Sequence, residues 1–145
     1  MPGEGHTLSD TEFVESMQDA YEATDQRVPF LAGLIVNSTV QAIRRTRMLE
    51  GMKVVALQVT PVHYLFKPDE QATIQHFRTI WEETGIPILI YNVIPWNYLS
   101  VDSMLRIMDE VPGVIGMKQS SGDLKSLSDL LLNVKEPNIV LSGID

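Results

Sequence analysis

The strongest constraint on the fold is a regular alternation of short apolar runs with amphipathic stretches. Five runs, each nearly continuous in apolar residues, occupy residues 28–35, 54–60, 87–93, 113–119 and 138–144. Continuous apolar runs of this length are typical of parallel strands that are covered on both faces. Their centres lie 26 to 32 positions apart, at Leu31, Leu57, Leu89, Ile115 and Leu141. The pattern therefore predicts a repeating strand–helix unit.

The segments between the runs are predicted to be amphipathic helices. Ser9 and Glu12 have the spacing of a capping box at a helix start. Ser38 can cap a second helix that Gly51 would end, and a third is expected from near Pro68-Asp69 to Gly85. Apolar stripes that we expect to pack in the core mark two more helices: Val101, Met104, Leu105 and Met108, then Leu124, Leu127, Leu131 and Val134.

Alternating strands and helices indicate an α/β fold with a parallel sheet, either an open doubly wound sheet or a barrel. Periodicity alone leaves both architectures open. No Gly-rich phosphate loop follows the first two strands, which end in GLIVNS and VTPVHY, so nucleotide binding gains little support. The 145 residues show no linker, and we expect one domain.

Composition excludes several classes of function. Eleven Lys+Arg against nineteen Asp+Glu give a net charge of −8, which disfavours nucleic acid and anionic membranes as partners. The chain has no cysteine, no signal-peptide pattern and no apolar stretch approaching the ~18 residues of a membrane span, so a cytoplasmic location is expected. His6, His63 and His76 lack metal-ligand spacing, and His76 is expected to be a surface or helix-packing residue.

Three residues whose side chains could take part in catalysis lie at or near the ends of three successive predicted strands: Thr60, Tyr91 and Lys118. Strand ends of a parallel sheet meet at one edge, and neighbouring strands lie ~4.8 Å apart. Burying the ammonium of Lys118 in an apolar run is costly, so this setting favours the neutral amine, which can attack a ketone to form a Schiff base. A tyrosine beside it can relay protons. The structural alternatives are a lysine that extends to solvent and a tyrosine that merely packs.

Several ordered motifs then resemble one family. Tyr91-Asn92 before Pro95 resembles a YNxP motif, and Gly116-Met117-Lys118 resembles a GxK motif. Further similar elements are Thr60-Pro61, the SSGD of 120–123, the LSGID of 141–145 and the GE…LS…E stretch of 3–12. Together they resemble the dihydrodipicolinate synthase/N-acetylneuraminate lyase family of Schiff-base aldolases over essentially all 145 residues.

The resemblance implies a parallel (β/α)8 TIM barrel, present here as an incomplete barrel of about five strands. Residues 1–145 would form a partial TIM-barrel domain, with the first two strands before Met1 and the end of the barrel after Asp145. It also implies a carbon–carbon lyase or hydratase-aldolase acting on a 2-oxo acid such as pyruvate, in a homo-oligomer that is a tetramer in the family. The alternatives are a catalytically incomplete fragment and a 2-oxo-acid binding protein without turnover.

By resemblance, Lys118 would form the imine and Tyr91 would move protons, assisted by Tyr64 or by His63 in its place. Thr60 would position this relay by hydrogen bonding. We expect His63, Trp96 and Gly143 to bind substrate. No metal or organic cofactor is expected, because the protonated imine is the electron sink.

The sequence also departs from the family pattern. No arginine follows the YNxP-like element, and Trp96 stands there instead, which suggests a more apolar or bulkier acceptor. The family's GTTGE loop, whose threonine hydroxyls help to bind the carboxylate, survives only as Pro2-Gly3-Glu4. The missing arginine and the presence of Trp96 argue against dihydrodipicolinate synthase activity itself.

Overall fold

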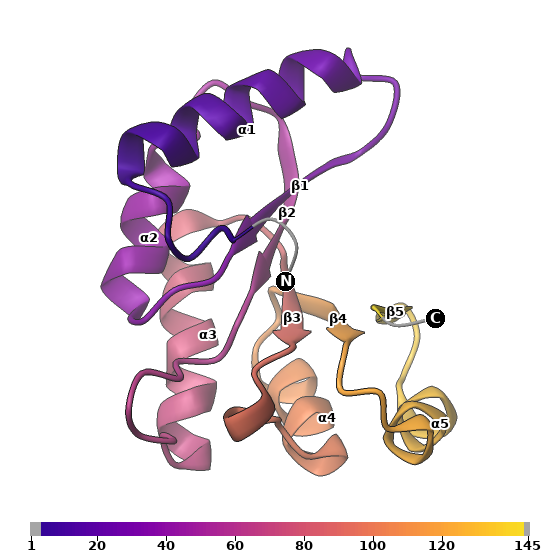
Figure 1. Cartoon of the computed structure of the whole chain (residues 1–145). Coiled ribbons are helices and arrows are strands. Elements are labelled where there is room, and N and C mark those ends of the chain that lie inside the picture. Colours follow the sequence, from indigo (N-terminus) through magenta and orange to yellow (C-terminus); the bar gives the residue numbers. More distant parts are fainter. Residues whose placement is uncertain (1–3, 144–145) are drawn as a thin grey trace.

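The sheet of this protein contains five parallel strands in chain order, and the computed structural model describes residues 4–143. The strands are β1 (Phe30–Leu34), β2 (Val54–Val59), β3 (Ile88–Asn92), β4 (Val114–Gln119) and β5 (Ile139–Ser142). Figure 1 shows them side by side from β1 to β5. All five predicted strands are confirmed, while Pro2, Gly3, Ile144 and Asp145 of the family motifs lie outside the described residues.

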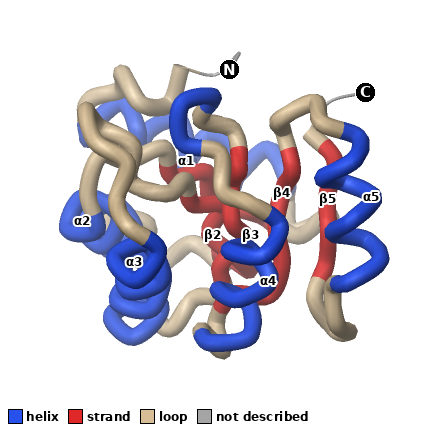
Figure 2. The backbone as a smooth tube through the Cα atoms, turned by 90° about the horizontal axis from the view of Figure 1, so that it is seen from below, coloured by secondary structure: helices blue, strands red, loops and turns tan. Residues whose placement is uncertain are grey.

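Each strand is preceded by a helix, as the alternating pattern predicts. The helices are α1 (Asp10–Thr24), α2 (Thr39–Arg47), α3 (Glu70–Thr84), α4 (Val101–Glu110) and α5 (Leu124–Asn133), with a 3-10 turn η1 (Pro95–Asn97) after β3. Helices α2 to α5 contact one another in chain order and line the outer side of the sheet (Figure 2). This arrangement is a segment of a parallel β/α barrel.

Capping residues set most helix ends where the sequence predicts them. The Ser9–Glu12 capping box is present, and the side chain of Asp69 caps α3. Gly85 ends α3 with φ 65°, a left-handed conformation that glycine adopts without strain. The predicted end of α2 is wrong, because the helix stops at Arg47 and Gly51 lies in the following turn.

The core lies between the sheet and its helices. Its fully buried side chains include Phe13, Leu57, Phe77, Ile90 and Met117. These residues come from α1, α3, β2, β3 and β4 and belong to one apolar cluster. The outer layer of the barrel segment is therefore well packed.

The inner face of the sheet is less covered than the sequence predicts. Leu31 on β1 and Leu141 on β5 are 38% and 40% exposed, so two-sided burial is wrong for these edge strands. Leu124 and Leu131 of α5 are also exposed rather than packed in the core. The physical reason is that no second layer of described residues lies over these surfaces. Large exposed apolar surfaces normally mark a contact with further protein.

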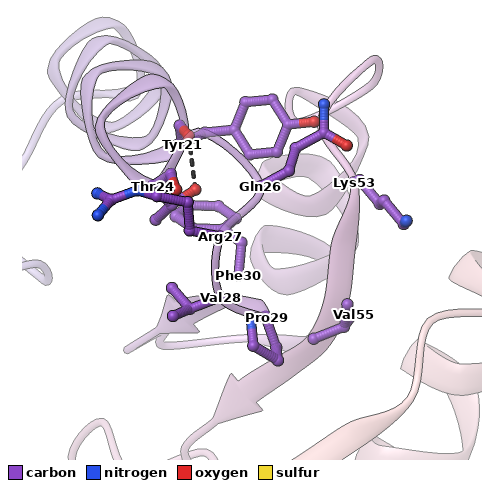
Figure 3. A pocket seen from close by; sticks show the side chains of 9 residues that line it. All are labelled: Tyr21, Thr24, Gln26, Arg27, Val28, Pro29, Phe30, Lys53 and Val55. Atoms are coloured by element: carbon purple, nitrogen blue, oxygen red, sulfur yellow. Dashed lines mark hydrogen bonds between the residues drawn. The ribbon is translucent and has the colours of Figure 1, made fainter.

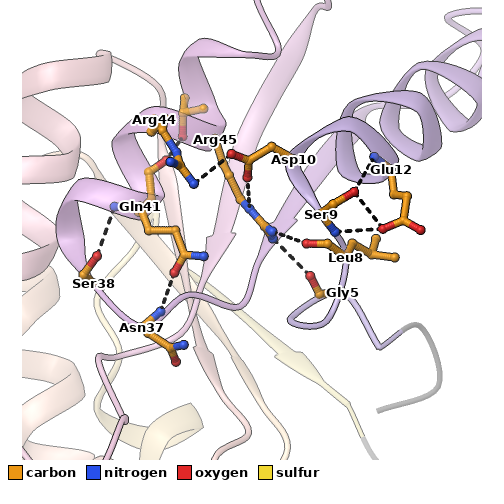
Figure 4. Close-up of polar contacts among 12 residues, drawn as sticks. Gly5, Leu8, Ser9, Asp10, Glu12, Asn37, Ser38, Gln41, Arg44 and Arg45 are labelled. Atoms are coloured by element: carbon orange, nitrogen blue, oxygen red, sulfur yellow. Dashed lines mark hydrogen bonds and ion pairs between the residues drawn. The ribbon is translucent and has the colours of Figure 1, made fainter.

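Arg45 fastens the segment before α1 to helix α2 (Figure 4). Its side chain is 3% exposed, and its guanidinium donates to the carbonyl oxygens of Gly5 (3.1 Å) and Leu8 (2.6 Å). The carboxylate of Asp10 lies 3.4 Å from Arg45 Nε, and the Arg45 guanidinium stacks over the Phe13 ring. These bonds satisfy a buried charge, as burial of a guanidinium requires.

Candidate active site

Tyr91 and Lys118 are side by side at the carboxyl ends of β3 and β4. They are direct partners in the parallel pairing of the two strands, so their side chains leave the sheet on the same face. Lys118 Nζ lies 4.8 Å from the centroid of the Tyr91 ring, which is within the range of a cation–π contact. The structure thus brings together the amine and the phenol that the sequence singles out.

The surroundings of this pair are partly sheltered. Both side chains are half-buried, and Lys118 Nζ lies against the Tyr91 ring. Burial raises the pKa of the Tyr91 phenol above its ordinary value. The phenol is therefore protonated near neutral pH, where it can both donate and accept a hydrogen bond.

Thr60 follows β2 directly and is fully buried. Its N–H donates to the carbonyl of Leu34 (3.2 Å), and its Oγ1 accepts from the N–H of Val36 (3.4 Å). Val59 pairs with Ile90, and the pairing of β2 with β3 ends there, one residue before Thr60 and Tyr91. Within residues 4–143 the two side chains share no hydrogen bond.

The loops after β2 and β3 are tied together at the same edge of the sheet. Trp96 Nε1 donates to the carbonyl of His63 (3.0 Å), and the two rings meet edge to face at 6.2 Å. Asn97 Nδ2 donates to the carbonyl of Val62 (2.7 Å). Trp96 itself is 69% exposed and Tyr64 is 63% exposed. Within residues 4–143 the Tyr64 carbonyl accepts from the N–H of Phe66 (2.7 Å), while its side chain makes no hydrogen bond or ring contact, so the structure does not bring the Tyr64 phenol to Tyr91 or Lys118.

Gly143 lies next to the side chains of Lys118 and Ser120. A Cβ at this position would lie 2.0 Å from Ser120 Oγ and 2.9 Å from Lys118 Cε, so any side chain here would require Ser120 and Lys118 to shift. The Ser120 side chain is buried, and its hydroxyl has no hydrogen-bond partner among the described residues. The sequence reasoning missed Ser120 as a neighbour of the site. Its place two residues after Lys118, on the same face of the strand, was the available signal.

Asn92 is a second residue that sequence reasoning missed. Its Oδ1 accepts from the N–H of Leu99 (2.9 Å), and its Nδ2 donates to the Leu99 carbonyl (3.3 Å) and to Gln119 Oε1 (2.9 Å). These bonds close the loop that carries Trp96 and attach it to β4. The asparagine of the YNxP-like motif therefore has a structural role next to the candidate tyrosine.

Histidine 76 is buried in α3, so the prediction that His76 packs within the fold is confirmed and the surface alternative is wrong. Its ring contacts Thr60 and Thr39. The described part of the chain contains no group of three potential metal ligands and no helix that is long and apolar enough to cross a membrane.

A hollow of about 280 Å³ lies at the opposite end of the strands (Figure 3). Tyr21, Gln26 and Lys53 stand around it, with Pro29 and Phe30 in its apolar wall. It borders the amino ends of β1 and β2, whereas Tyr91 and Lys118 lie near the carboxyl ends of β3 and β4. The hollow is thus separate from the candidate active site.

The fold and the site define a segment of a TIM barrel with a lysine and a tyrosine adjacent at its mouth. The chain belongs to the dihydrodipicolinate synthetase family, whose sequence model matches residues 1–145. It is 37% identical to the 4-hydroxy-tetrahydrodipicolinate synthase of Neisseria meningitidis serogroup B, covering 99% of this chain and 49% of that protein. For the corresponding Bacillus subtilis protein the identity is 33%, covering 99% of this chain and 50% of that one.

Solved structures agree with this assignment. The pyruvate complex of the dihydrodipicolinate synthase from Acinetobacter baumannii has a TM-score of 0.87 and 29% identity, covering 97% of this chain and 48% of that one. The 4-hydroxy-tetrahydrodipicolinate synthase from Methylacidiphilum fumariolicum has a TM-score of 0.84 and 29% identity, covering 94% and 46%. The chain spans about half the length of the curated relatives it matches.

Proposed function

We propose that this chain is the central part of an imine-forming carbon–carbon lyase that acts on a 2-oxo acid such as pyruvate. The observation that carries the proposal is the position of Lys118 Nζ, 4.8 Å from the Tyr91 ring centroid at the carboxyl ends of paired strands. Functional residues of TIM barrels lie at this end of the strands. The pyruvate complex of a relative supports the choice of ligand.

The proposed chemistry begins when neutral Lys118 Nζ attacks the ketone carbon of the 2-oxo acid. The resulting carbinolamine loses its hydroxyl as water, which requires a proton delivered by the Tyr91 phenol. In the protonated imine, the nitrogen accepts the electron pair released when a neighbouring C–H or C–C bond breaks. Tyr91 receives or returns the proton in that step. Thr60 would position Tyr91 only if the working site brings their hydroxyls, which share no hydrogen bond within residues 4–143, into contact.

The remaining site residues have secondary roles in this proposal. His63 and Trp96 form one wall of the acceptor side, held together by the indole hydrogen bond. Gly143 leaves room for the adduct on Lys118. Tyr64 would reach the relay only after its exposed loop moves or when further protein packs over it.

We further propose that residues 1–145 form a partial barrel, completed by strands on both sides of it in a cytoplasmic, oligomeric enzyme. The exposed inner face around Leu31 and Leu141 supports this idea. The same exposure favours a second candidate function, in which the chain binds a 2-oxo acid without turnover because the barrel is open.

The test is borohydride reduction of the purified protein in the presence of pyruvate, followed by whole-protein mass spectrometry. We expect one reduced pyruvate adduct on the wild-type chain and none on Lys118→Arg. Lys125→Arg is the matched control, because Lys125 is an exposed lysine paired with Asp129 on α5. Stabilisation by pyruvate without any adduct would replace the lyase proposal with the binding function.

A further inference from the structure

The hollow between the end of α1 and the segments that enter β1 and β2 has an apolar wall (Figure 3). Val28, Pro29, Phe30 and Val55 form this wall, and Val28 and Val55 are exposed. The Tyr21 ring meets the Phe30 ring edge to face, with the centroids 5.5 Å apart. Binding sites typically have volumes of about 300–1,000 Å³, so a hollow of about 280 Å³ fits the flat body of a small molecule.

The polar groups at the rim of the hollow can donate hydrogen bonds. Gln26 carries an amide and Lys53 an ammonium, and neither side chain has a hydrogen-bond or ion-pair partner within residues 4–143. The ammonium of Lys53 stands on a flexible four-carbon stem, so it can turn toward a bound anion. Arg27 adds a second cation, and no carboxylate is among the described residues that line the hollow. In a chain with a net charge of −8, such a lining favours an anionic ligand.

Arg27 also offsets a charge that would oppose an anion at this place. The carbonyl end of a helix carries a partial negative charge. At the end of α1, Arg27 Nε donates to the carbonyl of Thr24 (3.2 Å), and Nη2 donates to the carbonyl of Ala23 (3.0 Å). The backbone N–H of Arg27 donates to Thr24 as well (2.9 Å). The last carbonyls of α1 are therefore bonded to a cation.

The turn that carries Gln26 has a conformation that glutamine seldom adopts. Asp25 and Gln26 have φ values of 46° and 53°, in the left-handed region. Aspartate is common there and glycine fits without strain, whereas a glutamine is unusual. Residues held in such conformations cluster at ligand sites. Here the strained residue lines the hollow (Figure 3).

We propose that this hollow binds a small aromatic carboxylate, at a site separate from Lys118. The ring of the ligand lies against Pro29 and Phe30, and its carboxylate accepts hydrogen bonds from Gln26 Nε2 and Lys53 Nζ. Hydrogen bonds from a cation to a carboxylate are stronger than those between neutral groups. Binding here requires neither the imine nor the proton relay, so this site and the proposed lyase activity can each fail without the other.

The test is a titration of the ¹⁵N-labelled chain with benzoate, followed through the backbone amide signals in NMR spectra. We expect saturable shifts at the amides of residues 26–28 and 53–55, with a dissociation constant on the order of 1 mM for so small a ligand. Benzylammonium has the same ring and the opposite charge, and we expect it to bind at least roughly tenfold more weakly. Equal binding of the two ions, or no saturable shift at these amides, would overturn the proposal.

Two variants separate binding from stability. Lys53→Met removes the charge and should weaken benzoate binding roughly tenfold. Lys67→Met is the matched control, because Lys67 is also exposed, lies beyond the carboxyl end of β2 and has only the Tyr98 carbonyl as a partner. Gln26→Gly removes the amide and relieves the left-handed turn, so benzoate should bind severalfold more weakly while the urea midpoint of unfolding does not fall. Wild-type affinity in both Lys53→Met and Gln26→Gly would contradict the assignment of this site.

Discussion

Lys118 Nζ lies over the ring of Tyr91, 4.8 Å from its centroid, and the two residues are direct partners in the pairing of β3 with β4. The backbone register, and not a long flexible loop, therefore sets the distance between the amine and the phenol. Sites built on strands hold their geometry better than sites built on loops. Each prediction below follows from this placement or from the contacts that support it.

Tyr91→Phe should retain imine formation and lose proton transfer. The phenylalanine ring keeps the contact with the amine, while the hydroxyl that donates and accepts protons is removed. We expect deuterium exchange into pyruvate, measured by NMR, to fall roughly a hundredfold relative to the trapped adduct. Tyr21→Phe, beside the remote hollow, is the control. Exchange at the wild-type rate in Tyr91→Phe would remove Tyr91 from the relay.

Gly143→Ala should block the space beside Lys118. The added methyl group would lie 2.0 Å from Ser120 Oγ and 2.9 Å from Lys118 Cε, which forces the side chains of Ser120 and Lys118 to move. We expect the yield of borohydride-trapped adduct to fall roughly tenfold. Gly33→Ala on β1 is the matched control, because no heavy atom lies within 4 Å of its added methyl group. Equal yields in both variants would show that Gly143 does not limit the site.

Asn92→Ala should destabilise the fold. The change leaves the buried N–H and carbonyl of Leu99 and the amide of Gln119 without their partner. We expect the free energy of unfolding in urea to fall by about 2 kcal/mol or more. The control is Asn133→Ala, at an exposed end of α5, where the loss should be within about 0.5 kcal/mol. A similar small loss in both would mean that Asn92 does not secure the loop.

Protonation of His76 should weaken the fold in mild acid. The unfolded histidine binds a proton near pH 6.5, whereas burial lowers the folded pKa to about 4. The unfolded state therefore binds more protons in this window, and the stability present above pH 6.5 is lost as the pH falls toward about 4. The shift corresponds to a loss on the order of 3 kcal/mol.

The measurement is urea unfolding at several pH values, with His76→Gln as the reference variant. Carboxylates whose pKa values are lowered in the fold, such as Glu12 and Asp123, add their own loss in acid to both proteins. The difference between wild type and variant isolates the histidine. A parallel decline of both curves between pH 6.5 and 4 would contradict the assignment of His76 as a neutral buried ring.

The pattern of the sequence predicts the strands, their parallel order and the meeting of Tyr91 with Lys118. These features depend on periodic burial and on strand register, and both can be inferred from the pattern of apolar residues along the chain. The contacts of His76, and the indole bond from Trp96 to His63, depend on which backbone atoms the fold brings near, and no local pattern encodes them. The exposure of Leu31 was mispredicted because an apolar strand has the same pattern whether or not its second face is covered.

The most direct test of the central claim locates the adduct within the chain. After reduction of the protein with borohydride and pyruvate, peptide mass spectrometry would compare Lys118 with the other lysines, Lys53, Lys67, Lys125 and Lys135. We predict a reduced pyruvate adduct on Lys118 and none on the others. A folded protein in which Lys118 stays unmodified, or in which all five lysines react equally, would contradict the account.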